Sequence, residues 1–194
     1  MMKKLTAIFL ALMLLAGVCC AAAETIHHVP VMNMHLALPE EFLLFTPDTS
    51  EEADAAYGMT TSGIVEFMEA NDTYAIILPS DFAYEIDVSM AANTIETFND
   101  VDDDTLISMI DAIGAELETM GVVYDSGKFF HNGQDKYLVL FYHVPGDAYD
   151  TYAVQYYTVQ NNQAYNFRLF TYGVQATAEQ LAALENIMRG VTID

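Results

Sequence analysis

The residues best suited to chemistry are three aspartates, Asp100, Asp102 and Asp104, in the most acidic stretch of the chain. Their spacing matches the first, third and fifth ligand positions of a calcium-binding helix-loop-helix, and Asp111 stands at the twelfth. The sixth position is Thr105 instead of the glycine that makes the sharp turn, and an aspartate is too short for the bidentate twelfth ligand. The sequence therefore favours aspartates that cap a helix N-terminus, with a calcium-binding protein as the alternative.

Signatures of catalysis are missing from the sequence. It contains no G-x-S-x-G, H-E-x-x-H or glycine-rich phosphate-binding motif. The five histidines have no spacing that would place two of them on one helix face: His27, His28, His35, His131 and His143. With 28 acidic residues in the chain, a pair of carboxylates arises easily by chance. We therefore predict a protein that is not an enzyme and has no catalytic residue and no cofactor, with an unrecognised hydrolase as a second alternative.

A β-hairpin is predicted over residues 149–173, with its turn at Asn161-Asn162. This register places Gln160 opposite Gln163 and gathers apolar and threonine side chains on one face, which is predicted to be a core face. The members of that face are Tyr152, Val154, Tyr156, Thr158, Tyr165, Phe167, Leu169 and Thr171.

The opposite face of this hairpin is the candidate partner-binding surface. It carries Tyr157, Asn166, Arg168 and Phe170, and it places Arg168 opposite Gln155. Aromatic residues and arginine are enriched at the centres of protein interfaces. The alternative is that a helix covers this face and Arg168 extends past it to an acidic residue, either Glu179 or Glu185.

Residues 1–23 are predicted to be a signal peptide. A basic pair and an apolar run too short to span a membrane precede a small-residue cleavage site that ends at Ala23. A lipoprotein signal acylated at Cys19 or Cys20 is the less favoured alternative, because the residues before each cysteine fit it poorly. Cleavage after Ala23 would give a secreted or cell-envelope protein whose mature chain has no cysteine and no membrane span.

The mature chain, residues 24–194, is predicted to be a single α+β domain, with residues 24–30 as a mobile leader because they show no periodicity. Removal of the signal peptide would leave four basic residues against all 28 acidic ones. Such a surface repels nucleic acid and anionic lipid, so neither is expected as a partner.

Alternating and helical patterns divide the chain into predicted elements. Alternation predicts strands over residues 31–38, 42–45, 73–78, 84–90, 122–131 and 136–144, followed by the two arms of the hairpin. Amphipathic spacing and caps predict helices over residues 61–70, 105–120 and 177–189, and a short helical segment capped by Thr49 and Glu52. The strands over residues 73–78 and 137–144 are apolar on both sides, as in central strands covered on both faces.

This order of elements resembles the PsbP/Mog1-like superfamily, which includes DcrB-type and LpqN-type exported bacterial proteins. The resemblance is carried by the opening segment MNMHLALPEEF (residues 32–42), the aromatic strand YNFRLF (165–170), and the final segments TAEQ (177–180) and IMRGV (187–191). It implies an antiparallel β-sheet sandwiched between helices in three α/β/α layers. It also implies an accessory or partner-binding role, and no functional residue carries over from the family.

Composition, missing motifs and resemblance together predict an exported, non-catalytic binding or accessory protein of the bacterial cell envelope or extracellular space. Its partner would be an envelope or secreted protein. The sequence leaves the identity of that partner and the oligomeric state open.

Overall fold

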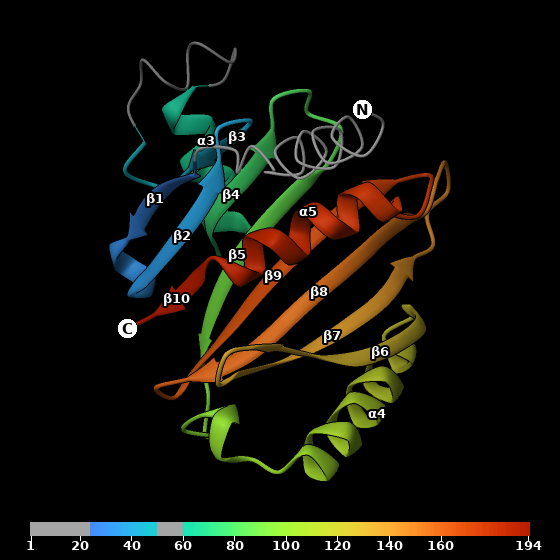
Figure 1. The fold of residues 1–194 in the computed structure, drawn as a ribbon. Coiled ribbons are helices and arrows are strands. Elements are labelled where there is room, and N and C mark those ends of the chain that lie inside the picture. The colour runs from blue at the N-terminus through green and yellow to red at the C-terminus, as the bar shows by residue number, and fades with distance from the viewer. Residues whose placement is uncertain (1–23, 50–59) are drawn as a thin grey trace, which may run out of the picture.

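A computed structural model describes residues 24–49 and 60–194. Its largest component is a seven-stranded antiparallel sheet (Figure 1). The strands lie in the order β3 (Phe42–Phe45), β4 (Thr73–Pro79), β5 (Glu85–Ala92), β9 (Gln163–Tyr172), β8 (Thr151–Gln160), β7 (Asp135–Val144) and β6 (Val123–Asn132). A second, three-stranded antiparallel sheet has β2 (Met34–Pro39) between β1 (Glu24–Val29) and β10 (Val191–Ile193).

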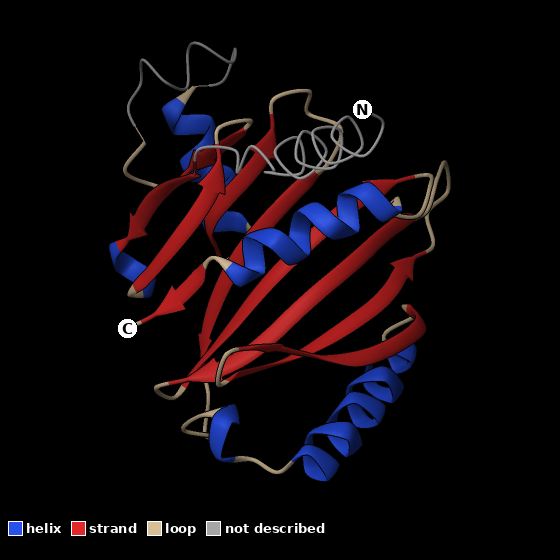
Figure 2. Cartoon of the chain, in the orientation of Figure 1, coloured by secondary structure: helices blue, strands red, loops and turns tan. Residues whose placement is uncertain are grey.

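Helices lie on both faces of the large sheet (Figure 2). On one face, α5 (Ala178–Arg189) and the three-stranded sheet share a core with the inward side chains of β4, β5 and β7–β9. On the other face, α3 (Thr61–Ala70) packs over β3 and β4, and α4 (Asp103–Thr119) packs over β6 and β7. Short 3-10 helices occur at Pro30–Met32 and Phe98–Asp100. The predicted α+β fold with helices on both faces of an antiparallel sheet is confirmed.

None of the helices in residues 24–49 and 60–194 is long and apolar enough to cross a membrane.

The hairpin of β8 and β9 has the predicted register, with Gln160 opposite Gln163 and Gln155 opposite Arg168. Asn161 and Asn162 both have positive φ, at 54° and 60°, as a two-residue type I′ turn requires. Asparagine tolerates this left-handed conformation better than most residues, which explains why this pair joins the two strands. Five side chains of the predicted core face lie in the core beneath α5, and Tyr152 at the end of the face is only partly buried. The five are Val154, Tyr156, Tyr165, Phe167 and Leu169.

Side-chain caps set the starts of α4 and α5. Asp102 is the N-cap of α4 and accepts a hydrogen bond from the backbone N–H of Thr105 at 2.8 Å. Thr177 and Gln180 form a capping box at the start of α5. Gly121 follows α4 with a φ of +82°, a conformation that favours glycine. The predicted role of aspartates as caps of the helix N-terminus is confirmed at Asp102.

Two expectations about the N-terminal part need correction. Residues 24–30 were predicted to be a leader without structure, but Glu24–Val29 forms β1, which pairs with β2 along its whole length. This pairing supplies the order that the segment's own pattern does not indicate, and it buries Val29 in the core. The strand predicted over residues 31–38 begins only at Met34, because Pro30 opens a 3-10 helix that ends at Asn33 with a φ of 52°.

Other elements match their predictions with smaller differences. The strands expected to be central, β4 and β7, are paired on both sides but each lies one strand from an edge, and β9 occupies the middle. The loop between β6 and β7 has two residues, since Asn132 pairs with Asp135. The short helical segment predicted from Thr49 and Glu52 lies mostly outside the described residues.

Candidate functional site

Helices α3 and α4 cover the two ends of one sheet face and leave β5, β9 and β8 between them. We call the side chains on this part of the face the central strip, defined as Glu85 and Asp87 of β5 and Arg168, Phe170 and Tyr172 of β9. Strand alternation points the neighbouring residues Ile86, Val88, Phe167 and Leu169 into the core beneath α5. The strip therefore combines aromatic and charged side chains on a sheet whose other face is apolar.

The charged centre of the strip is an ion pair between Asp87 and Arg168, which are direct cross-strand neighbours. Arg168 binds the carboxylate with two hydrogen bonds, from Nε at 3.3 Å and from a terminal nitrogen at 3.0 Å. The guanidinium also lies 5.7 Å from the centre of the Phe170 ring. Burial raises the pKa of Asp87 to about 6, even though the neighbouring Arg168 charge and its hydrogen bonds act in the opposite direction.

Polar side chains continue from the strip toward α4. Tyr142 donates a hydrogen bond to Oε1 of Gln155 at 3.0 Å, and Gln155 donates through Nε2 to Oδ1 of Asn166 at 2.6 Å. Tyr157 accepts a hydrogen bond from the Asn93 amide at 3.1 Å. These groups satisfy one another, so the surface is held in one arrangement.

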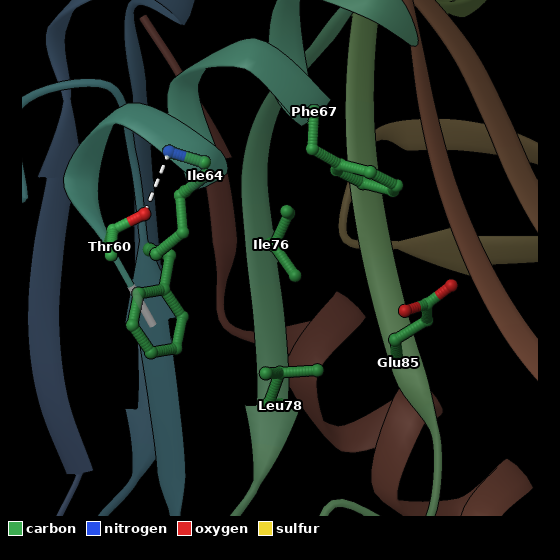
Figure 3. A pocket seen from close by; sticks show the side chains of 8 residues that line it. Thr60, Ile64, Phe67, Ile76, Leu78 and Glu85 are labelled. Carbon is green, nitrogen blue, oxygen red and sulfur yellow. Dashed lines mark hydrogen bonds between the residues drawn. The ribbon is translucent and has the colours of Figure 1, made fainter. Parts of the chain in front are cut away.

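At its other side, the strip meets an apolar pocket beneath α3, with a volume of about 330 Å³ (Figure 3). Thr60 caps α3 by accepting a hydrogen bond from the backbone N–H of Gly63 at 3.2 Å, and this sets the helix over β4. Eight described residues line the pocket: Phe45, Thr60, Gly63, Ile64, Phe67, Ile76, Leu78 and Glu85. A mostly apolar pocket of this size with few polar groups is typical of ligand-binding sites.

Glu85 connects the pocket with the strip. Its carboxylate accepts a hydrogen bond from the Tyr172 hydroxyl at 2.6 Å. Burial, together with this hydrogen bond to a carboxylate, raises the pKa of Tyr172, so the hydroxyl remains a donor at neutral pH. Phe67 extends from α3 on the same side of the pocket as Glu85 (Figure 3), and its side chain is 47% exposed.

The four predicted partner-binding residues share one sheet face but differ in their surroundings. Arg168 and Phe170 belong to the central strip, whereas Tyr157 packs edge-on against Phe98, with ring centres 5.3 Å apart. Asn166 lies in the hydrogen-bonded row and is partly buried. All four are partly exposed.

The alternative contact of Arg168 with Glu179 or Glu185 is wrong. Both glutamates are in the sequence of α5, on the opposite side of the sheet, and Arg168 pairs with Asp87 instead. Glu185 forms its own ion pair with Arg189 at 2.6 Å. Sequence reasoning missed Asp87 because the pairing of β5 with β9 was not predicted.

The acidic residues considered for calcium lie at the start of α4. Asp102 is occupied as the N-cap, Asp104 is in the first helical turn, and Asp100 ends the preceding 3-10 helix. The neighbouring Asp103 binds Lys136 at 3.0 Å. Within the described part of the chain, no group of three or more histidine, cysteine or acidic side chains is arranged to hold a metal ion.

Side-chain contacts of three of the five histidines lie in two separate parts of the fold. His35 contacts Asp194 at 3.1 Å and stacks on His28 with ring centres 4.6 Å apart. His143 contacts Asp125 at 3.2 Å. These contacts stabilise strand pairs at the surface, and they lie away from the pocket beneath α3.

Neither models of protein families nor curated proteins match this sequence. Solved structures show a distant similarity. The solution structure of cyanobacterial PsbP (CyanoP) from Synechocystis sp. PCC 6803 is 9% identical with a TM-score of 0.49, over 92% of this chain and 96% of that one.

Two further structures are similar at the same low level. A crystal structure from Bacteroides thetaiotaomicron VPI-5482 is 11% identical with a TM-score of 0.46, over 89% of this chain. It is about twice as long, since this chain covers 48% of it. A protein of unknown function from Pseudomonas aeruginosa is 11% identical with a TM-score of 0.37, over 86% of this chain and 94% of that one. The predicted PsbP/Mog1-like resemblance thus has a counterpart among solved structures, and nothing about function follows from likeness at this level.

Proposed function

We propose that this is an exported, non-catalytic binding protein that docks a segment of a partner protein on the central strip. The observation that carries the proposal is the position of the strip, a band of aromatic and charged side chains between two helices that cover the two ends of the same sheet face. Phe170 and Arg168 are of the residue types that dominate binding energy at interface centres. Tyr172, which is 50% exposed, and Phe67 extend the aromatic surface on either side of Glu85.

The chemistry of the surface argues for binding rather than catalysis. Asp87 and Arg168 are bound to each other, and so are Gln155 and Asn166. Side chains that satisfy one another hold the shape of a surface, and a preformed surface loses little conformational entropy when a partner binds.

Charge indicates the kind of partner. The chain has 28 acidic residues against 6 lysines and arginines, so its field attracts basic proteins and repels acidic ones. Within the strip, the charge of Arg168 is matched by Asp87, and the Glu85 carboxylate is held beside the apolar pocket. The expected occupant is therefore a partner segment that carries apolar and basic side chains together.

Panning a displayed library of random peptides on the mature chain tests this proposal. The wild-type protein should select peptides in which a large apolar residue lies next to lysine or arginine. Tyr172→Ala, a change within the strip itself, should weaken the binding of those peptides at least fivefold, because an exposed aromatic at an interface contributes about 1 kcal/mol or more.

Ile107→Ala is the matched control. Ile107 is a large apolar residue of α4 with 48% exposure, against 50% for Tyr172, and it lies outside the strip and the pocket. Its replacement should leave peptide binding unchanged. Selection of no common pattern, or equal loss of binding in both variants, would refute the proposed docking surface.

A further inference from the structure

The pocket beneath α3 has an apolar interior and one charged side chain among its described lining residues. Ile64, Ile76 and Leu78 form its walls together with Phe45 and Phe67, and Glu85 stands on β5 at its side toward the strip (Figure 3). A volume of about 330 Å³ is large enough for one long aliphatic or aromatic group.

Glu85 is held in place by one hydrogen bond and keeps further capacity to accept others. The Tyr172 hydroxyl binds Oε1 at 2.6 Å, and a carboxylate has lone pairs for further donors on both oxygens. The nearest cation of the strip, Arg168, is bound to Asp87 by two hydrogen bonds, so its charge is already balanced. The carboxylate of Glu85 is therefore held by the neutral Tyr172 hydroxyl and not by Arg168, so a cation of a ligand could bind it.

We infer that this pocket binds an apolar group that carries a cation at one end, with the apolar part among Ile64, Ile76 and Leu78 and the cation on Glu85. The inference rests on the proposed function and deepens it, because it specifies what the docked segment places in the pocket: a large apolar side chain with a lysine or arginine beside it. Anionic and neutral groups with the same apolar part would bind less well, since they lack the attraction to Glu85.

Three small molecules with one apolar chain and different ends separate these contributions: octylammonium, octanol and octanoate. Each is titrated below its aggregation limit, at fixed ionic strength, into the mature chain with labelled isoleucine methyl groups. The methyl signals of Ile64 and Ile76 should shift, whereas those of Ile110 and Ile187 should not, because these two lie in other parts of the core. Octylammonium should bind about two- to fivefold more tightly than octanol, the range expected of a partly exposed ion pair, and octanoate should bind most weakly.

Glu85→Gln tests the role of the carboxylate and retains an oxygen that can accept the Tyr172 hydrogen bond. This variant should bind octanol as the wild type does and lose its preference for octylammonium. Glu66→Gln removes one charge from an exposed position of α3 outside the pocket, and it should keep the preference.

The inference is overturned if the three probes bind equally, if octanoate binds best, or if Glu66→Gln abolishes the preference as fully as Glu85→Gln. It also fails if the methyl signals of Ile64 and Ile76 do not respond to octylammonium. These failures differ from failure of the proposed function, because selected peptides that bind the wild type and lose affinity in Tyr172→Ala would still establish docking on the strip, and Tyr172 does not line the pocket.

Discussion

At the scale of single residues, two opposing effects act on the pKa of the Asp87 carboxyl group. It lies in the middle of a sheet with only 12% of its side chain exposed, and burial favours its neutral form. Arg168 favours the charged form through two hydrogen bonds and its charge. Burial is the larger effect, so the folded protein holds this proton more tightly than the unfolded chain does.

Because the pKa of Asp87 is raised on folding, its contribution to the free energy of unfolding should decrease as the pH rises. The pKa of Asp87 is about 6 in the folded protein and near the ordinary 3.8 in the unfolded chain. Between these values the folded state binds more protons, so the free energy of unfolding falls as pH increases from about 4 to about 6 and then levels off. Asp87→Asn removes this contribution, and its stability relative to the wild type should rise by about 2 to 3 kcal/mol from pH 4 to pH 7.

Urea unfolding of wild type and Asp87→Asn at several pH values measures this difference directly. Asp147→Asn, at an exposed position in the loop between β7 and β8, is the control for loss of one negative charge. If the wild type instead gains stability over Asp87→Asn as pH rises, the ion pair with Arg168 outweighs burial.

The sequence predicted part of the site. The two-residue turn at Asn161-Asn162 sets the register of the hairpin. From this register, the sequence correctly placed Arg168 and Phe170 on one face. The partner strand β5 comes from a distant part of the chain, and strand alternation does not specify which strands become neighbours. Asp87 and Glu85 alternate with Ile86 and Val88, which does indicate a strand with one polar face; their place beside Arg168 requires the tertiary structure.

At the scale of elements, α5 is the main cover of one sheet face. Leu184 is fully buried in the core that α5 shares with both sheets, together with Ile187 and Met188. Its position follows from the amphipathic spacing of the helix, which was visible in the sequence together with the capping box. The pairing of β1 and β10 with β2 was not visible, because short strands of weak pattern gain their order from neighbours distant in sequence.

Leu184→Ala should lower the free energy of unfolding by about 2 to 5 kcal/mol, since it leaves a cavity between α5 and the sheets. Asn186→Ala, at an exposed position of the same helix, should change it by no more than about 0.5 kcal/mol. Urea unfolding of both variants measures the contrast. A loss below about 0.5 kcal/mol in Leu184→Ala would mean that α5 does not pack on the sheets as described.

Helix α4 approaches β6 closely at two glycines. A Cβ atom at Gly114 of α4 would lie 2.7 Å from the Tyr124 ring, and one at Gly127 of β6 would meet Ile110. Alanine is normally the better helix residue by about 1 kcal/mol. In Gly114→Ala, however, displacement of the Tyr124 ring should outweigh that gain, because overpacking costs about 1 to 3 kcal/mol.

We therefore expect Gly114→Ala to lower the melting temperature. Ser108→Ala, at an exposed position of the same helix, should leave it unchanged or slightly raised, because alanine has the higher helix propensity. Thermal unfolding followed by circular dichroism compares the two variants. A Gly114→Ala protein more stable than the wild type would show that α4 can move away from β6 without loss.

At the scale of the whole molecule, the many negatively charged side chains repel one another. The formal net charge of the chain is −22, and most of this charge is not balanced by a nearby base. Exposed charges of one sign interact over about 30 Å at 10 mM salt and over about 8 Å at 150 mM. Added salt should therefore stabilise the fold by screening, whatever the identity of the cation.

The charge distribution gives a prediction that separates screening from a calcium site at Asp100, Asp102 and Asp104. Raising sodium chloride from 10 to 150 mM should increase the melting temperature by roughly 2 to 4 °C, the equivalent of about 1 kcal/mol in a chain of this size. Calcium chloride at matched ionic strength should have a similar effect, because Asp102 is engaged as the N-cap of α4.

The variant with asparagine at all three positions should keep the same response to both salts. Asparagine caps a helix about as well as aspartate, so α4 should still form. The measurement is a melting curve of wild type and triple variant in each salt. If calcium stabilises the wild type well beyond sodium and the triple variant loses that difference, these aspartates bind calcium, and their role extends beyond capping α4.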